Sequence, residues 1–252
     1  MSLSWVSGIN SVAALMESAV DRVESVWAVQ GSKNKRIQEL VEQAQRQGLD
    51  VVFKPLAQLS SKVESSQHQG IIAQWNSPQN MNLDSLLERL KGIKNPLILV
   101  LEEITDPRNL GACLRVAGGA GVDAVIKTMH QSASITPIAW KTSAGAAATV
   151  PVCEVSSIPK ALKKLQDAGL WSYGLAGEAT QSIYQTDLSS GGVIVMGSEG
   201  SGLKKLTRKH CDFLISLPLL GQVESLNVSV ATGVTLYEAV RQRIIKEQNS
   251  TD

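Results

Sequence analysis

Short hydrophobic runs recur along the second half of the chain and are separated by segments with helical spacing. From Pro96 onward the apolar runs predict strands, and the segments between them predict amphipathic helices. Continuous apolar strands that alternate with helices are typical of a parallel sheet covered on both faces. We therefore expect an α/β domain over residues 96–252. Its strands are predicted at 97–101, 124–127, 150–155, 171–176, 192–196 and 213–217, and its helices at 107–120, 136–147, 158–168, 204–211 and 226–246.

The first part of the chain has the same alternation on a smaller scale. Residues 1–75 predict a small α/β domain, because short apolar runs alternate with helical patterns. Gly48 is placed to end the second helix as a C-cap residue. Residues 76–95 are polar with one short amphipathic stretch, which indicates a partly helical linker. In the small domain, strands are predicted at 23–29, 49–53 and 70–75, and helices at 7–19, at 36–47 and after Pro55.

Composition narrows the class of protein without revealing its chemistry. The chain of 252 residues is 43% hydrophobic and 19% charged, as in ordinary soluble proteins. It contains no run of about 18 apolar residues, and its start lacks the basic and apolar regions of a signal peptide. We therefore expect a cytoplasmic protein with no membrane partner. The net charge of +1 neither demands nor excludes a polyanionic partner.

The cysteines and histidines do not suggest a metal site. The cysteines are three and scattered, and each lies in an apolar or helical context. This pattern favours structural thiols in a reducing compartment over a metal or redox site. No histidine stands at ligand spacing from them, so we expect no metal. The residues concerned are Cys113, Cys153, Cys211, His68, His130 and His210.

Three polar loops follow predicted strands of the larger domain. They begin near Ile104, Gly197 and Leu217. In parallel sheets, ligands bind beyond the carboxyl ends of the strands. The three loops therefore predict one composite site at that edge of the sheet.

The first loop supplies a candidate cation. Asp106 is a plausible N-cap and Pro107 a plausible first helical residue. Arg115 stands in a small and apolar helix, where burying an unpaired guanidinium would be expensive, so an anionic group should meet it. Arg115 and Asn109 both face the strand ends only if Asn109 lies in the loop before the helix. A structural ion pair is the alternative, with Glu102, Glu103 or Glu199 as the partner of Arg115.

The second and third loops are rich in glycine and polar residues. Gly197, Gly200 and Gly202 follow a strand with G-x-x-G-x-G spacing, which is neither the dinucleotide fingerprint nor a P-loop. A dehydrogenase or nucleotide hydrolase therefore loses its main support, although a plain turn remains an alternative to a ligand loop. Glu199 adds a carboxylate here. In the third loop, polar side chains stand beside an apolar wall; they are Ser225 and Asn227, and the wall is Leu226 and Val228.

Two further features admit more than one interpretation. Gly233 lies in the last predicted helix, where a glycine costs about 1 kcal/mol relative to alanine. Close backbone packing, within the chain or across a dimer interface, would offset that cost. The basic loop with Lys33, Lys35 and Arg36, and the segment 62–69, lie at strand ends of the small domain. They indicate either RNA contacts or a merely solvated surface.

Three motifs in this order carry a resemblance to a known family. They read N-L-G-x-x-x-R, V-M-G-x-E-G-x-G-L and L-P-x-x-G-x-x-x-S-L-N-V-S-V-A. Residues 97–243 closely resemble the SpoU-type branch of the SPOUT RNA ribose 2'-O-methyltransferases. The first 75 residues, through GINSV and HQGIIA, look like the small ribosomal-protein-like RNA-binding domain that often precedes that catalytic domain.

The resemblance implies a fold, a cofactor and partners. The expected fold is a parallel-sheet α/β catalytic domain whose C-terminal segment, within 193–240, forms a trefoil knot. S-adenosylmethionine is expected in the knotted loops, and a homodimer is expected around them. Matching positions imply catalytic or RNA-positioning roles for Asn109, Arg115, Glu199, Ser225 and Asn227. They imply cofactor contacts, largely through backbone groups, for Gly197, Leu217 and Leu226, with neighbouring Ile215, Ser216 and Val228.

The implied reaction is methyl transfer to a ribose 2'-hydroxyl of RNA, with a guanosine of 23S ribosomal RNA as the expected target. Arg115 is then expected to orient the nucleophile and stabilise the developing alkoxide, because a guanidinium with a pKa above about 12 is a poor base. Two alternatives stay open at this point. The substrate could be a transfer RNA ribose, or the chain could be a non-catalytic dimeric RNA-binding protein.

Overall fold

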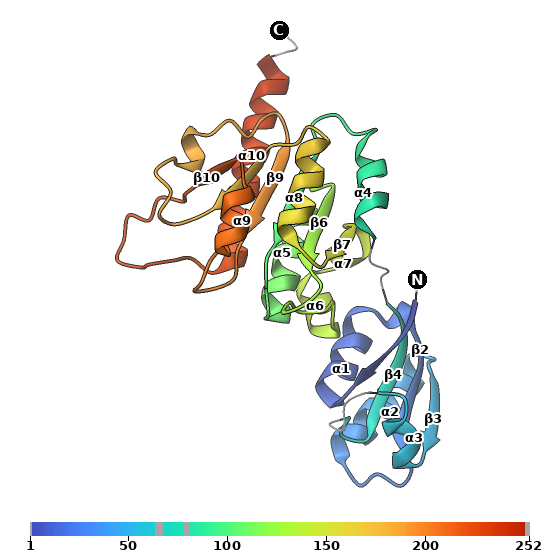
Figure 1. Ribbon diagram of the computed structural model, residues 1–252. Helices are drawn as coiled ribbons and strands as arrows, with labels where there is room; N and C mark the ends of the chain where they lie inside the picture. Colours follow the sequence, from blue (N-terminus) through green and yellow to red (C-terminus); the bar gives the residue numbers. More distant parts are fainter. Residues whose placement is uncertain (1, 64–67, 78–80, 250–252) are drawn as a thin grey trace.

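The computed structural model describes residues 2–63, 68–77 and 81–249 and has two α/β domains that lie against each other (Figure 1). Residues 64–67 of the basic segment and 78–80 of the predicted linker lie outside the described residues. Both predicted domain classes are found. Among the helices in the described ranges, none is long and apolar enough to cross a membrane.

The small domain is a four-stranded sheet with the order β1-β4-β2-β3. Strand β1 was not predicted; it pairs antiparallel with β4, and Gly8 with φ 92° then ends it before the first helix. The helix predicted from residue 7 therefore starts at residue 9. Gly48 has φ 76° just after α2, as predicted for a C-cap residue. The elements are β1 (Ser2–Ser7), α1 (Ile9–Ser18), η1 (Val20–Arg22), β2 (Val23–Val29), α2 (Lys35–Arg46), β3 (Asp50–Lys54), α3 (Leu56–Ser60) and β4 (Ile71–Ser77).

The larger domain is a six-stranded parallel sheet with the order β10-β8-β9-β5-β6-β7. Its strands agree with the predicted ones to within two residues at each end. The elements are α4 (Leu83–Leu90), β5 (Leu97–Leu101), α5 (Pro107–Gly119), β6 (Ala124–Thr128), α6 (Pro137–Thr142), α7 (Ala146–Thr149), β7 (Val152–Val155), α8 (Ile158–Asp167), β8 (Ser172–Leu175), η2 (Ile183–Gln185), β9 (Gly192–Met196), α9 (Lys205–His210), β10 (Phe213–Ile215) and α10 (Val228–Asn249).

The prediction of one continuous helix over residues 136–147 of the larger domain was wrong. The segment 136–147 forms two short helices, α6 and α7, instead of one. Ala144 and Gly145 adopt φ values of 49° and 90°, which break the helical path between them. The apolar pattern continues across the break because both helices pack toward the same core. Periodicity therefore did not reveal it.

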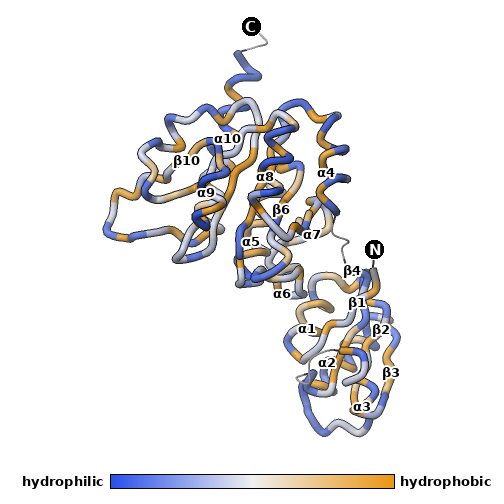
Figure 2. The backbone as a smooth tube through the Cα atoms, viewed as in Figure 1, coloured by the Kyte–Doolittle hydropathy of each residue, from blue (hydrophilic) through white to orange (hydrophobic). Residues whose placement is uncertain are grey.

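Both faces of the larger sheet are covered, as the continuous apolar strands predict. All residues of β5 and β9 are buried, and alternate side chains point to opposite faces. Leu99 packs into a core that contains Leu114 of α5 and Leu236 of α10. Val100 packs into the opposite core, with Leu86 of α4 and Leu162 of α8. The predicted linker thus contributes α4 to this sheet's outer layer, and Figure 2 shows hydrophobic and hydrophilic residues alternating along α4 and α8.

The two domains share an interface centred on Trp140 of α6. Its indole Nε1 donates a hydrogen bond to the carbonyl oxygen of Ser18 at 3.2 Å. Its ring meets Trp75 of β4 edge to face, with 5.5 Å between the centroids, and the guanidinium of Arg22 stands 4.7 Å above it. Lys141 also pairs with Glu17. These contacts join the small domain to the edge of the larger one.

The strand order decides where the polar loops meet. Because β9 lies between β8 and β5, the loops that leave these strands open at one edge of the sheet. The start of α10 reaches the same edge after the long loop that follows β10. The trefoil knot implied for this segment stays a prediction.

Candidate functional site

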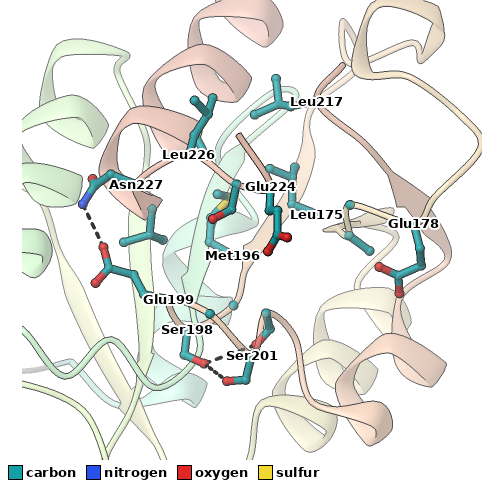
Figure 3. A pocket seen from close by; sticks show the side chains of 18 of the residues that line it. Leu175, Glu178, Met196, Ser198, Glu199, Ser201, Leu217, Glu224, Leu226 and Asn227 are labelled. Atoms are coloured by element: carbon teal, nitrogen blue, oxygen red, sulfur yellow. Dashed lines mark hydrogen bonds between the residues drawn. The ribbon is translucent and has the colours of Figure 1, made fainter. Parts of the chain in front are cut away.

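A pocket of ≈ 370 Å³ opens at this edge of the larger sheet (Figure 3). Its walls are the loops after β8 and β9 and the segment that leads into α10. Volumes of this order are typical of sites for small ligands and cofactors. The lining residues are Leu175, Ala176, Gly177, Glu178, Met196, Gly197, Ser198, Glu199, Gly200, Ser201, Gly202, Arg208, Leu217, Leu219, Glu224, Ser225, Leu226, Asn227, Val228 and Ala231.

The loop after β9 folds back on itself, and its glycines make this possible. Ser198 and Gly202 exchange backbone hydrogen bonds of 3.1 and 2.9 Å. A Cβ on Gly197 would stand only 2.1 Å from the carbonyl carbon of Gly202. Gly200 and Gly202 adopt φ values of 82° and 64°, which other residues rarely adopt. The G-x-x-G-x-G pattern thus forms a tight turn that brings backbone groups to the pocket wall.

The segment 217–227 forms the opposite wall and is largely exposed. Leu226 is 38% exposed and lines the pocket beside Leu217, whereas Val228 is buried at the start of α10. An exposed leucine beside a pocket leaves apolar surface that a ligand could cover. Ser225 also lines the pocket. With Asn227, five of the residues that the sequence assigns to this site therefore line the pocket on this side.

Three polar residues from the three loops meet beside the pocket. Asn109 Nδ2 donates to Glu199 Oε1 at 2.7 Å, and Asn227 Nδ2 donates to the same oxygen at 2.8 Å. Asn227 Nδ2 also lies 3.1 Å from Asn109 Oδ1. Ser229 holds Asn227 Oδ1 through its backbone N–H at 2.9 Å and its hydroxyl at 2.6 Å. The convergence of the loops is confirmed, and the asparagine side chains are oriented by it.

The environment of Arg115 differs from the sequence expectation. Arg115 is exposed, so the argument from the cost of burial was wrong. Asn109 is already the third residue of α5, and six helical residues place the two side chains about 120° apart around the axis. The condition for a shared face therefore fails. Within the described part of the chain, Arg115 forms no ion pair with an acidic side chain.

The carboxylates weighed as partners of Arg115 have other contacts. Glu102 is buried and accepts hydrogen bonds from the backbone N–H of Lys204, at 2.8 Å, and from the hydroxyl of Thr207. It thereby caps the start of α9. Glu103 pairs with the ammonium of Lys204, which raises the pKa of that lysine. Neither contact leaves a carboxylate for the guanidinium.

Two predicted cofactor residues do not line the pocket. Ile215 is fully buried in the core beneath the loop. The backbone N–H of Ser216 donates to the carbonyl of Gln181 at 2.8 Å, and its hydroxyl lies 3.3 Å from the same oxygen. Both residues fix the path of the chain after β10. In this arrangement they support the wall that carries Leu217.

The sequence interpretation missed the pocket residues that follow β8. Glu178 and Arg208 form an ion pair, and Arg208 Nε also donates to the carbonyl of Leu203 at 3.0 Å. Together they tie the β8 loop to the β9 loop. Glu178, Glu199 and Glu224 place three carboxylates along the pocket. The signal was present, because Gly177 and Glu178 follow a strand just as the other loops do.

The cysteines are buried or half-buried and are not activated. Burial raises the pKa of Cys113 and of Cys153 to about 11, and that of Cys211 to about 12. The thiols therefore stay protonated near neutral pH and lack the thiolate needed for reactivity. Across the described residues, no three histidine, cysteine, aspartate or glutamate side chains are grouped as a metal would require.

Two other sequence features have specific surroundings. Gly233 faces Val116 of α5, and an added Cβ would meet its methyl groups at 3.8 Å, which is ordinary contact. Close packing within the chain therefore does not explain this glycine. In the basic loop, Asn34 caps α2, and Arg36 donates to the side chain of Asn10 at 3.0 Å.

Comparison with known proteins gives consistent matches over both domains. Residues 96–237 match the SpoU rRNA Methylase family, and residues 5–81 match the family described as RNA 2'-O ribose methyltransferase substrate binding. A relative from Pasteurella multocida, named 23S rRNA (guanosine-2'-O-)-methyltransferase RlmB, is 46% identical over 95% of this chain and 98% of its own length.

Solved structures with the same fold cover most of the chain. The SpoU methyltransferase AviRb from Streptomyces viridochromogenes, solved in complex with AdoMet, has a TM-score of 0.63 at 22% identity. That match covers 95% of this chain and 90% of AviRb. The TrmH/SpoU tRNA modifying enzyme of A. aeolicus has a TM-score of 0.56 at 28% identity, over 67% of this chain and 85% of that one.

Proposed function

Because this chain belongs to the SpoU rRNA methylase family, we propose that it transfers a methyl group from S-adenosylmethionine to a guanosine ribose 2'-hydroxyl of 23S ribosomal RNA. One observation carries the proposal: the cofactor-sized pocket opens directly beside the cluster of Asn109, Glu199 and Asn227. The relative named above matches over nearly the whole length of both proteins, which favours a shared substrate. We also infer that the protein acts in the cytoplasm.

The pocket suits S-adenosylmethionine in charge and polarity. Glu178 is paired with Arg208, but Glu199 and Glu224 have no ion-pair partner among the described residues, and their carboxylates favour a cationic ligand. Leu217 and Leu226 provide apolar surface for a flat ring system. When bound, the cofactor supplies an electrophilic methyl group on a sulfonium. The tight turn at Gly197 keeps backbone groups of the β9 loop at the pocket wall, where they would hold the cofactor.

The polar cluster would hold the ribose. A 2'-hydroxyl is a poor nucleophile at neutral pH, so the site has to align it and to stabilise a developing alkoxide. Asn227 is held by Ser229, and its two amide N–H groups donate to Glu199 and Asn109. The cluster thus fixes the side chains that would surround the ribose, so the charge that stabilises the alkoxide has to come from a cation. The proton would pass to water or to a phosphate oxygen of the RNA.

In this proposal the protein is a homodimer, and Arg115 of one copy supplies the cation for the site of the other copy. Exposed apolar residues of α10 recur every seven positions at Val230, Tyr237 and Ile244, so they form one stripe; they are 50%, 52% and 49% exposed. The Tyr237 hydroxyl lies 3.0 Å from where a Cβ on Gly119 would stand. Arg115 is one turn before Gly119 and so borders the stripe. A second copy that covers the stripe would bring Arg115 to its partner's RNA site.

Family membership also supports the trefoil knot expected within residues 193–240. A knot would explain how the loops after β9 and β10, which belong to one continuous segment, both line the pocket. General rules of chain topology disfavour knots, so this element rests on the family alone.

Calorimetry and a methyl-transfer assay on purified full-length protein test the proposal. We expect S-adenosylmethionine to bind and a 23S ribosomal RNA transcript to gain one 2'-O-methylguanosine, with no methylation of bulk transfer RNA. Methylation of transfer RNA alone would replace the substrate assignment. The absence of cofactor binding would instead indicate a non-catalytic RNA-binding protein.

A further inference from the structure

The small domain carries an aromatic pair on the face of its sheet opposite to α1 and α2. Trp5 of β1 and Trp27 of β2 meet edge to face, with 4.9 Å between their centroids. Trp5 is paired with Gln74 of β4, and Trp27 with Ile72, so all four side chains lie on one face. Both rings are half-buried. Together with Lys54 and Lys62, these two tryptophans form a surface that we call the outer face.

A purely structural role explains only part of this arrangement. Ile72 lies on the same face as the tryptophans and is fully buried outside both main cores, as is Leu59 of α3, a helix that contacts β2. Both tryptophans nevertheless keep part of their surface in solvent. Exposed aromatic surface on a strand is a platform on which a flat group can stack.

Two lysines stand over the same aromatic pair. The ammonium groups of Lys54 and Lys62 lie 5.7 and 5.9 Å from the ring centroid of Trp27. The described residues offer neither ammonium a carboxylate within ion-pair distance. The outer face therefore combines aromatic surface with positive charge that no described acidic side chain neutralises.

A cleft between the domains continues the outer face toward the larger domain. Its volume is ≈ 460 Å³, and Trp5 forms part of its wall. Hydroxyl groups line it from both sides, with Ser7 and Ser11 from the small domain and Ser134 and Thr136 from the larger one. Its carboxylate, Glu154, is paired with the ammonium of Lys127 at 2.8 Å. Hydroxyls donate and accept hydrogen bonds, so they suit base edges and ribose hydroxyls.

The loop between β6 and α6 connects this cleft to the methylation site. Ser134 lines the cleft, whereas Gln131 lines a hollow that also contains Asn109 and Glu199. The backbone N–H of Ala133 donates to the carbonyl of Ile104, at 2.7 Å, which anchors this loop beside the start of α5. The β6–α6 loop therefore borders both the cleft and this hollow, which also contains the carboxylates of Glu103 and Asp106.

We propose that the outer face and the cleft bind unpaired nucleotides of the RNA that flank the methylated ribose. One base stacks on the Trp5 and Trp27 pair, and Lys54 and Lys62 contact the backbone phosphates. The cleft hydroxyls bind the next nucleotide. Sequence-tolerant stacking on aromatic side chains and charge pairing with phosphates are the features of single-stranded RNA recognition. The inference rests on the proposed function for the identity of the RNA, but its surface and chemistry are independent of it.

Binding and methylation of a 23S ribosomal RNA transcript by the full chain test this inference. Lys54→Glu with Lys62→Glu should raise the RNA Kd and the KM at least about tenfold, and lower the salt dependence of log Kd by about 1.4 for two lost phosphate contacts. Trp5→Leu should raise the Kd about tenfold, and Trp5→Phe should restore most of the affinity, because a stacking ring returns. The maximal rate and S-adenosylmethionine binding should stay unchanged.

A matched pair of charge reversals controls for net charge. Lys94 and Lys209 are exposed and precede β5 and β10, so they lie at the amino ends of the strands, away from the site. Lys94→Glu with Lys209→Glu changes the net charge equally and should leave the Kd within about twofold, since charges beyond a Debye length are screened.

The outcomes separate this inference from the proposed function. If the wild-type chain binds RNA through the outer face but methylates a different RNA, the inference stands and the substrate assignment changes. A wild-type chain that methylates the 23S transcript, with lysine and tryptophan variants that match it in Kd and salt dependence, overturns the inference. If Trp5→Leu fails to fold, the lysine pair and Trp5→Phe still decide it. If the wild-type chain does not bind the RNA, both the inference and the proposed function are overturned.

Discussion

The methylation site and the outer face of the small domain differ in how the fold brings their residues together. At the site, the functional groups belong to loops at strand ends or to the helix that follows such a loop, and they meet because the strands are neighbours. On the outer face, the two tryptophans come from different strands that pairing with β4 brings together, and Lys62 comes from the segment after α3. The first kind is visible as motifs in the sequence. The second is visible only after the sheet is known.

Hydrogen bonding differs between the regions in the same way. Asn109, Glu199 and Asn227 hold one another, so the site is preorganised for one geometry. Lys54 and Lys62 lie over an aromatic ring without a described acidic partner. A fixed cluster suits a reaction at one atom, and a loosely held aromatic and basic surface suits a polymer with variable sequence.

Replacing Arg115 should give the largest difference between the effect on methyl transfer and the effect on RNA binding. Arg115→Ala should lower the rate of methyl transfer about 100- to 1,000-fold, as expected for the loss of a charged group that stabilises the transition state. RNA affinity should change much less, because the outer face remains. Arg115→Lys should also be slow if the planar guanidinium is required. Arg89→Ala, at another exposed helical arginine, is the control. Near-normal methylation by Arg115→Ala with the cofactor bound would remove Arg115 from the site.

Gly197→Ala should reduce cofactor affinity about 100-fold or more. The added Cβ would overlap the carbonyl carbon of Gly202, so the turn has to open. Gly177→Ala is the matched control, because Gly177 lines the same pocket and a Cβ there meets nothing within 4 Å. Calorimetric titration with S-adenosylmethionine measures both. Equal affinities in the two variants would show that the β9 turn does not shape the pocket.

Two glutamates at neighbouring strand ends should give opposite phenotypes. Glu199→Gln should lower methyl transfer about tenfold or more, because it removes a charge-assisted acceptor, and should leave the melting temperature nearly unchanged at this exposed position. Glu102→Ala should destabilise the fold by about 2–4 kcal/mol, since it leaves the Lys204 N–H and the Thr207 hydroxyl without their acceptor. Initial rates and denaturant unfolding measure the two effects. A destabilised Glu199→Gln variant, or a stable Glu102→Ala variant with slow methyl transfer, would contradict these roles.

Gly233→Ala is expected to have the smallest effect. Alanine favours a helix by about 1 kcal/mol over glycine, and the nearest methyl groups of Val116 leave room for its Cβ. The isolated chain should therefore become slightly more stable. Sedimentation at several concentrations compares the variant with wild type, for which we propose a dimer. Loss of the dimer would mean that a second copy approaches the backbone at this glycine.

Sequence patterns predicted the larger domain well because its strands are apolar throughout. The strands around β5 and β9 were predicted almost to the residue, and loops at neighbouring strand ends had to converge. The orientation of Arg115 was beyond such reasoning. It depends on where α5 begins, and a start at Pro107 turns Asn109 and Arg115 to different faces.

The small domain shows what periodicity leaves out. Strand β1 is short and at the start of the chain, and its pairing with β4 spans most of the domain in sequence. Without that pairing, Trp5 and Trp27 are two isolated aromatic residues. The break between α6 and α7 was missed for a related reason, since a left-handed residue such as Ala144 has no signature in hydrophobic spacing.

Mapping of 2'-O-methyl groups across total RNA tests the central claim most directly. Cells with the gene, cells without it, and cells that carry only the Arg115→Ala variant would be compared. The account predicts that one guanosine of 23S ribosomal RNA loses its methyl group without the gene, and that the variant does not restore it. An unchanged 23S methylation pattern in cells without the gene would contradict the account.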